Sequence, residues 1–202
     1  EVPAGMRDVP GEPTEITAPS VQEDSEAQQP QAVAPSVRRR SLIVLGLVAL
    51  SVIAVDQLTK HWVVTTILPR IQSGEGPLEF FGGFLKLTYT ENTGAAFSIG
   101  TGYTWIFSIF AVIVAVVILR SSRRLGSVWW AVALGGLLGG LLGNLIDRLT
   151  REPGPGRGYV VDWIAFPHFA VFNVADSAIV CSAILMVALS VFGVEFSGKR
   201  SG

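Results

Sequence analysis

The 202-residue chain has little charge, one cysteine and two histidines. Only 15% of its residues are charged, whereas a soluble globular domain carries about 25%. The single cysteine, Cys181, excludes a disulfide framework, and His61 and His168 do not have zinc-site spacing. A net charge of −1 disfavours a nucleic-acid binder. Because half of the residues are hydrophobic, the composition predicts an integral membrane protein with several helices and with no metal or cofactor.

The charge that is present is unevenly distributed. Residues 1–37 contain one basic and seven acidic residues, a net charge of −6, and they have no aromatic residue. A stretch rich in Pro, Glu, Gln and Ser cannot bury enough apolar surface to offset its ordering entropy, so we expect a disordered acidic tail. It lacks the basic-then-apolar pattern of a signal peptide. A dispensable solvated extension is favoured over a regulatory or docking segment.

Four apolar stretches follow, each close to the roughly 20 residues that a membrane-spanning helix needs. They cover residues 41–68, 103–119, 128–146 and 171–194 of a membrane domain that spans 38–196. The third stretch is rich in glycine, with Gly135 and Gly139 in one small-xxx-small row and Gly136 and Gly140 in another. Such rows allow helix backbones to approach closely in lipid, so we interpret them as packing surfaces.

Basic residues near the ends of these stretches predict the orientation of the chain. The clusters before the first stretch, between the second and third, and after the fourth are Arg38, Arg39 and Arg40, then Arg120, Arg123 and Arg124, then Lys199 and Arg200. In a four-helix chain all three clusters fall on one side, which the positive-inside rule assigns to the cytoplasm. Both termini, including the short tail 197–202, are therefore expected in the cytoplasm.

The segment 77–90, between the first two apolar stretches, is not a featureless loop. It is rich in aromatic residues and threonine, alternates partly, and is interrupted by Gly82 and Gly83. This pattern predicts one or two short strands. Because open strand edges are not tolerated in hydrocarbon, a small sheet is expected at the outer membrane interface.

Several polar residues lie at the outer ends of the predicted helices, where buried charge is costly and is a functional hypothesis by default. Asp56 and Lys60 are four residues apart on one helix face and are able to pair. Asp147 is followed directly by Arg148, so a structural or substrate-orienting role is favoured there. Clusters at one depth on several helices indicate a shared site that opens to the outer leaflet.

Asp162 and Asp176 form the most informative pair. Asp162 follows a Gly/Pro-rich turn within an apolar run, and Asp176 begins the fourth helix. Two carboxyl groups in a partly dry site do not both ionise cheaply, so one acts as an acid and the other as a base near neutral pH. The alternative, that each caps a helix or pairs with an arginine, is equally compatible with the residues. A serine protease that uses Ser98 and His168 is a weaker possibility, since Ser98 has no nucleophile elbow.

Five ordered motifs resemble those of lipoprotein signal peptidase (signal peptidase II), in an actinobacterial-like form. They are Asp56-Gln-Leu-Thr-Lys60, Glu91-Asn-Thr-Gly-Ala-Ala-Phe-Ser98, Gly143-Asn-Leu-Ile-Asp-Arg148, Val160-Val-Asp-Trp163 and Phe172-Asn-Val-Ala-Asp-Ser177. The resemblance extends over about residues 41–194. The tail and the Pro/Gly-rich insert 152–158 depart from the family pattern without affecting a motif residue.

The resemblance implies an aspartic endopeptidase of the bacterial cytoplasmic (inner) membrane, active toward the outer leaflet. Its substrate is a prolipoprotein with a diacylglyceryl-cysteine lipobox, cut on the amino side of that cysteine, and its inhibitor is globomycin. The implied catalytic dyad is Asp162 and Asp176. The implied substrate-binding residues are Asp56, Lys60, Asn92, Gly94, Asn144, Asp147, Arg148, Asn173 and Ala175.

The implied fold is an all-α bundle of four transmembrane helices with a small extracytoplasmic β-sheet, the cradle. A short periplasmic helix and lid are expected within 150–168, and the enzyme is expected to be a monomer among membrane phospholipids. Two other classes also fit acids at membrane depth: a small transporter or proton-conducting bundle, and a scaffold held by the glycine rows.

Overall fold

The computed structural model describes residues 34–94 and 104–198, all within the compact unit Ala32–Gly202. Among these residues, four helical segments are long and apolar enough to cross a membrane: Pro35–Gln72, Trp105–Arg124, Val128–Thr150 and Val174–Val191. They confirm the four predicted stretches, although the expected start of the second at residue 103 lies outside the described residues. Most of the predicted tail also lies outside them, and the first helix begins at Pro35, inside the predicted tail boundary.

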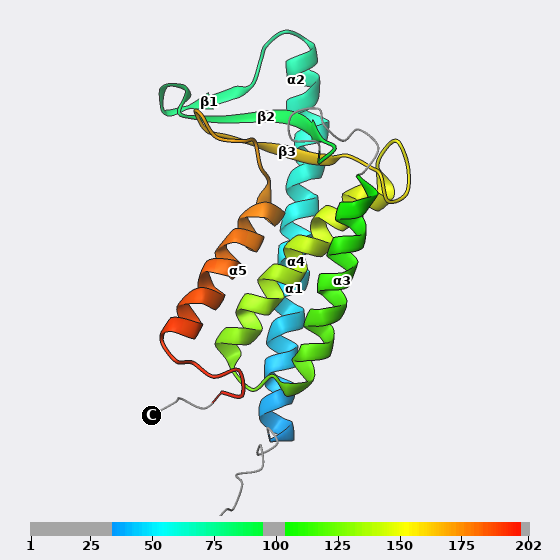
Figure 1. The fold of residues 1–202 in the computed structure, drawn as a ribbon. Helices are drawn as coiled ribbons and strands as arrows, with labels where there is room; N and C mark the ends of the chain where they lie inside the picture. The colour runs from blue at the N-terminus through cyan, green and yellow to red at the C-terminus, as the bar shows by residue number, and fades with distance from the viewer. Residues whose placement is uncertain (1–33, 95–103, 199–202) are drawn as a thin grey trace, which may run out of the picture. The chain divides into compact units, whose positions relative to one another are not determined.

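The first spanning segment is longer than predicted and contains a change of helix type. Helix α1 (Pro35–Trp62) continues through the π-helical turn η1 (Val63–Ile67) into α2 (Leu68–Gln72). Thirty-eight residues at 1.5 Å each measure about 57 Å, well beyond a hydrocarbon core of about 30 Å. The far end therefore rises beside the sheet, as Figure 1 shows. There Val63 and Ile67 are fully buried in a cluster with Val161.

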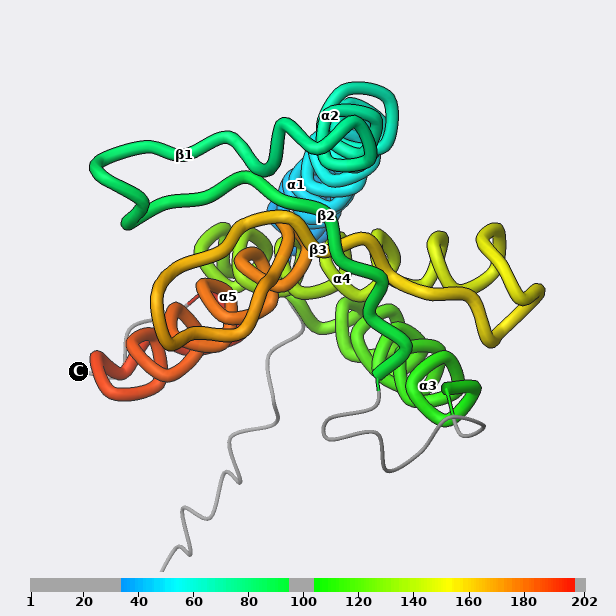
Figure 2. The backbone as a smooth tube through the Cα atoms, turned by 90° about the horizontal axis from the view of Figure 1, so that it is seen from above, coloured from blue at the N-terminus to red at the C-terminus, as the bar shows by residue number. Residues whose placement is uncertain are grey.

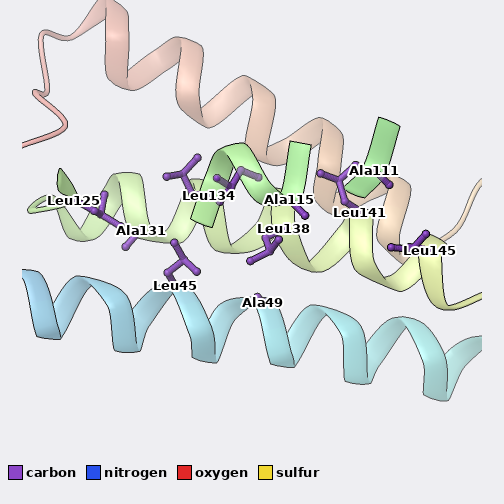
Figure 3. Packing of buried hydrophobic residues seen from close by; sticks show 11 residues of the cluster. Leu45, Ala49, Ala111, Ala115, Leu125, Ala131, Leu134, Leu138, Leu141 and Leu145 are labelled. Atoms are coloured by element: carbon purple, nitrogen blue, oxygen red, sulfur yellow. The ribbon is translucent and has the colours of Figure 1, made fainter. Parts of the chain in front are cut away.

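Helix α4 (Val128–Thr150) is the centre of the bundle. It packs between α1, α3 (Trp105–Ser121) and α5 (Val174–Val191), as seen from above in Figure 2. The short 3-10 turn η4 (Ser122–Arg124) follows α3 and leads toward α4. The buried core consists mainly of leucines of α4 packed against small residues of α1 and α3, shown in Figure 3.

The glycine rows are confirmed as packing surfaces for two different helices. A Cβ atom at Gly135 or Gly139 would stand 2.7 Å from a backbone oxygen of α1. A Cβ atom at Gly140 would stand 2.5 Å from the Ala175 oxygen of α5. Contacts this short require glycine, so one side of α4 accepts α1 and an adjacent side accepts α5.

A three-stranded antiparallel sheet lies at the end of the bundle where α4 ends and α5 begins (Figure 1). Its order is β1 (Leu78–Phe80), β2 (Leu85–Asn92) and β3 (Val160–Ala165). The turn η2 (Phe81–Gly83) joins β1 to β2, and its glycines adopt φ values of 68° and 88°. The predicted strands and their glycine break are therefore confirmed, whereas β3 is an additional strand.

The short helix expected within 150–168 is not there. Residues 151–159 form turns, and strand β3 occupies Val160–Ala165. The physical reason is local: two prolines and three glycines between residues 153 and 158 oppose helix formation, and the β-branched and aromatic residues that follow favour a strand. Gly158 closes onto the end of α4, where its N–H donates to the Arg148 oxygen at 3.0 Å.

Candidate active site

Strand β3 carries Asp162 to the end of the bundle. It pairs with β2 so that Asp162 lies opposite Thr90, next to a register irregularity between Leu87 and Thr90. The Asp162 side chain is 1% exposed. Its two oxygens accept hydrogen bonds from the side-chain amides of Asn92, at 2.8 Å, and Asn173, at 2.6 Å. A buried carboxyl group thus lies between two neutral donors.

Asp176 lies in the first turn of α5, as the sequence predicts. Asn173 is the N-cap, and the two residues form a reciprocal capping box. The Asn173 oxygen accepts the Asp176 N–H at 3.0 Å, and an Asp176 oxygen accepts the Asn173 N–H at 3.3 Å. The other Asp176 oxygen accepts a hydrogen bond from the Asn144 amide at 2.8 Å. Asp176 therefore does cap its helix, yet it is not completely buried and faces the same asparagine as Asp162.

Asn173 connects the two carboxyl groups. Its amide nitrogen donates to Asp162 while its oxygen receives the Asp176 backbone N–H. Burial raises the pKa of Asp162 to about 6, the Asp176 charge adds to the rise, and the hydrogen bonds from Asn92 and Asn173 oppose it. A carboxyl group that titrates near 6 exchanges protons readily close to neutral pH, as general acid–base chemistry requires.

Beside this pair lies a buried ion cluster made of Asp56, Lys60, Asp147 and Arg151. The Lys60 Nζ atom is 2.8 Å from Asp56 and 2.9 Å from Asp147, and Arg151 Nε is 2.9 Å from the other Asp147 oxygen. The first three residues are 0% exposed. The predicted i, i+4 pair of Asp56 and Lys60 is confirmed, and Asp147 joins it from α4.

The third Lys60 donor links the ion cluster to the carboxyl pair. Lys60 Nζ donates to the Asn144 oxygen at 2.9 Å. Because an ammonium group has only donors, this contact requires the Asn144 oxygen to face Lys60 and its amide nitrogen to face Asp176. The charge on α1 therefore fixes the side-chain orientation of a residue that binds Asp176.

Backbone contacts extend the ion cluster to α5 and β3. The Ala175 N–H donates to Asp56 at 3.0 Å, and the Val161 N–H donates to Asp147 at 3.2 Å. A Cβ atom at Gly143 would stand 2.7 Å from an Asp56 oxygen, so glycine is needed there for α1 to approach. The residues that flank Asp162 and Asp176 are thus held by carboxylates from α1 and α4.

Arg148 differs from the sequence-based pairing. The cations paired with Asp147 are Lys60 and Arg151, not the adjacent Arg148. Arg148 is 8% exposed, and its guanidinium lies 5.2 Å from the centre of the Phe107 ring and 3.5 Å from the Gly158 oxygen. The structural or substrate-orienting role predicted for Asp147 stays a prediction, and its ion-pair partners are Lys60 and Arg151.

Asn92 and Gly94 form the edge of the site at the end of β2. The Gly94 N–H donates to the Asn92 side-chain oxygen at 2.7 Å, which leaves the Asn92 nitrogen directed at Asp162. Gly94 has a φ of 81°, and a Cβ atom there would stand 2.6 Å from the Phe107 ring. Ser98 lies outside the described residues, and His168 is exposed in the turn after β3.

Sequence reasoning missed two contributors. Arg151 was not singled out, although it lies four residues after Asp147, at the C-cap of α4 and at the spacing at which helical charges pair. Gln57 donates to the Gly143 oxygen at 3.0 Å and to Asp56 at 3.2 Å. Nothing in its own pattern distinguishes it from other polar residues. Within the described residues, no group of three or more His, Cys, Asp or Glu is placed to hold a metal ion.

Comparison with known proteins identifies the chain's relatives. The family model for signal peptidase (SPase) II matches residues 48–192. A lipoprotein signal peptidase of Mycobacterium tuberculosis is 45% identical over 196 residues, which cover 95% of this chain and 93% of the relative. The Rhodococcus jostii lipoprotein signal peptidase is 43% identical over 182 residues, with 89% of each chain covered. Both agree with the predicted actinobacterial-like form.

The fold has solved counterparts as well. A bacterial membrane enzyme determined by the in meso method at 1.9 Å superposes with a TM-score of 0.60 at 31% identity, covering 72% of this chain and 90% of the other. A second, determined at 2.3 Å, gives a TM-score of 0.59 at the same identity. A multi-pass membrane protein with this fold and these relatives is a protease rather than a transporter or scaffold. The chain belongs to the signal peptidase II family, whose members remove signal peptides from prolipoproteins.

Proposed function

We propose that this protein is an intramembrane aspartic endopeptidase whose catalytic residues are Asp162 and Asp176. The supporting observation is the shared asparagine: Asn173 binds the Asp162 carboxyl group through its nitrogen and the Asp176 backbone through its oxygen. Both carboxyl groups receive only neutral N–H donors among the described hydrogen bonds. Neither charge is cancelled by a bonded cation, which leaves the pair able to hold a single proton.

In the proposed reaction, the ionised carboxylate removes a proton from a water molecule held between the two side chains. The water oxygen bonds to the scissile carbonyl carbon, and the protonated carboxyl group gives its proton to the carbonyl oxygen. When the tetrahedral species collapses, the carbon–nitrogen bond breaks. The leaving amine takes the proton that the first carboxylate had removed from water, and the second carboxylate takes a proton back from a hydroxyl of the tetrahedral species as the new carboxyl group forms. The pair thereby returns to one proton.

The residues around the pair divide by their bonding partners. One set adjoins the carboxyl groups, and we assign it to orienting the dyad and the substrate backbone. It consists of Asn92, Asn144, Asn173 and Gly94. We propose that Arg148, near the end of α4, contacts the substrate. A second set is 0% exposed and is joined by ion pairs and a hydrogen bond, so we assign it to stabilising the structure of the site rather than to direct substrate contact. It consists of Asp56, Lys60, Asp147 and Ala175.

The family supports a prolipoprotein substrate, and we propose that its lipobox cysteine carries a diacylglyceryl group. We propose cleavage on the amino side of that cysteine, with the lipid chains remaining in the bilayer between helices. We propose that both termini lie in the cytoplasm and that the active site faces the outer leaflet of the bacterial cytoplasmic membrane. The positive-inside rule supports this orientation, because the described arginines within 38–40 and 120–124 lie at the end of the bundle opposite the sheet. The enzyme is proposed to act as a monomer among phospholipids and to be blocked by globomycin.

The test is a gel-shift assay on a diacylglyceryl-modified prolipoprotein. Asp162→Asn and Asp176→Asn should each lower the cleavage rate by about 1,000-fold or more, since general acid–base catalysis contributes about 100- to 10,000-fold and each group acts in both steps. Glu79→Gln, an exposed carboxylate paired with Lys86 on the hairpin, is the matched control and should cleave normally.

Each variant should elute as folded protein with an unchanged helical circular-dichroism signal. If globomycin does not inhibit cleavage by the parent protein, the proposal that globomycin blocks the enzyme is wrong. Near-normal cleavage by either Asp→Asn variant would overturn the dyad.

A further inference from the structure

At the end of the bundle opposite the sheet, three arginines surround a hollow of about 630 Å³. It lies between the end of α3 and the segment that follows α5, which passes beside the α3–α4 connection in Figure 1. Its lining residues are Val117, Arg120, Ser121, Arg123, Arg124 and Phe196. None of them belongs to the peptidase site described above.

The walls of this hollow are fixed by the fold. The N–H groups of Gly126 and Ser127 both donate to the Phe196 oxygen, at 3.0 and 3.2 Å. The Phe196 ring packs on Trp130 with 5.6 Å between ring centres, and the Trp130 indole N–H donates to the Val194 oxygen at 2.7 Å. Leu125, between the arginines and Gly126, is 0% exposed. The hollow is therefore preformed.

The charge inside the hollow is uncompensated. In the described part of the chain, no hydrogen bond or ion pair is formed by the side chains of Arg120, Arg123 or Arg124. Glu195 is next to Phe196 in sequence, but its carboxylate accepts a hydrogen bond from Ser197. The three guanidinium groups, at the end of α3 and on η4, repel each other, so an anion that binds between them lowers the free energy of the folded protein.

We propose that this hollow binds the headgroup of one anionic phospholipid. Guanidinium groups form paired hydrogen bonds with phosphate oxygens, and Val117 and Phe196 offer apolar surface to the glycerol and upper acyl carbons. Basic pockets between membrane helices on the cytoplasmic side are suited to such headgroups. The choice of the cytoplasmic leaflet rests on the proposed orientation, whereas the site itself does not depend on it.

A second arginine cluster provides the contrast within the same chain. Arg38 and Arg39 line a hollow with Pro35, Leu42 and Ile43, all from one face of α1. Among the described residues, α1 alone lines that hollow, so its arginines extend from a single helix. Arginines without a second wall should attract anionic lipid only through the general field of the surface.

The experiment uses the full chain purified in detergent and titrated with phosphatidylglycerol or phosphatidylcholine under native mass spectrometry. We expect one retained phosphatidylglycerol per protein and no retained phosphatidylcholine. The triple variant Arg120→Gln, Arg123→Gln, Arg124→Gln should weaken phosphatidylglycerol retention at least about 10-fold, the loss of roughly one charge-assisted interaction. The matched triple variant Arg38→Gln, Arg39→Gln, Arg40→Gln should retain it.

Equal retention of both lipids, or equal weakening by both triple variants, would overturn the proposal. Both triple variants should cleave the prolipoprotein in detergent at the parent rate, because neither set of arginines adjoins the carboxyl pair. A parent protein that binds the lipid but cleaves nothing would refute the peptidase assignment and leave the lipid site standing.

Discussion

The two groups of buried carboxylates in this protein differ in their partners. Asp56 and Asp147 each lie within 3 Å of a lysine or arginine nitrogen. Asn144 separates these two residues from the second group, Asp162 and Asp176. The carboxyl groups of the second group receive hydrogen bonds from neutral amides and backbone N–H groups. A bonded cation compensates the charge of a carboxylate, whereas neutral N–H donors leave that charge uncompensated. The ion-paired carboxylates, Asp56 and Asp147, are therefore suited to stabilising the site, and the carboxyl groups without a bonded cation, Asp162 and Asp176, are suited to catalysis.

Asn144 and Asn173 allow the two groups to coexist so closely. Asn144 accepts a hydrogen bond from Lys60 and donates one to Asp176. It therefore fixes the positions of both side chains relative to each other while remaining neutral. Asn173 does the same between Asp176 and Asp162. Neutral amides therefore separate a compensated cluster from an uncompensated pair at the same end of the bundle.

Removal of the central cation should have the largest effect on stability. Lys60→Met would leave Asp56 and Asp147 buried with one cation fewer, and breaking a buried ion pair typically costs about 3–5 kcal/mol. We expect a large fall in the thermal midpoint or failure to accumulate, measured in detergent. Lys86→Met is the matched control: its pair with Glu79 is about half exposed, so it should cost no more than about 1 kcal/mol. Equal effects of the two variants would contradict the structural role of the ion cluster.

The pH dependence of stability should reveal the titration of Asp162. Its pKa rises from 3.8 to about 6 on folding, so between these values the folded state holds a proton that the unfolded state has lost. Stability therefore falls as pH rises from about 4 to about 6, by up to roughly 3 kcal/mol at 1.36 kcal/mol per pKa unit. Unfolding curves across this range should show the fall in the parent protein and a flatter profile in Asp162→Asn. Parallel profiles would indicate that Asp162 does not titrate there.

A smaller effect is expected where α1 meets α4. Gly143→Ala would place a methyl group 2.7 Å from an Asp56 oxygen and should cost about 1–3 kcal/mol through displacement of the ion cluster. Gly46→Ala, where nothing lies within 4 Å, is the control and should be neutral or stabilising by about 1 kcal/mol. Thermal unfolding of both variants measures the difference. A Gly143→Ala protein as stable as the control would show that the approach of the two helices is not constrained there.

Much of the helical framework could be predicted because its determinants are local. Hydropathy located four spanning helices, and the spacing of the glycines identified the packing faces of α4. The Asp56–Lys60 pair was predictable from its i, i+4 spacing. The β2 strand and its glycine break also followed from alternation and turn residues.

The remainder depends on contacts between distant segments. Strand β3 forms by pairing with β2 some 70 residues earlier, as the Asn92–Asp162 hydrogen bond shows, and no local pattern encodes that partner. The contacts of Lys60 with Asp147 and Asn144 are likewise long-range. Asp162 and Asp176 were notable as acids in apolar surroundings, but their chemistry alone left a capping role equally open. The capping box shows that Asp176 does fill that role.

The most direct measurement compares the same substitution in both groups. Four variants would be assayed for thermal midpoint and for single-turnover cleavage per folded molecule. They are Asp56→Asn, Asp147→Asn, Asp162→Asn and Asp176→Asn. We predict that the first two lower the midpoint while cleavage stays within about 10-fold of the parent, and that the last two keep the fold while cleavage falls about 1,000-fold or more. Cleavage that survives in the Asp162 or Asp176 variant, or that falls equally in all four, would contradict the assignment of catalysis to the unpaired carboxylates.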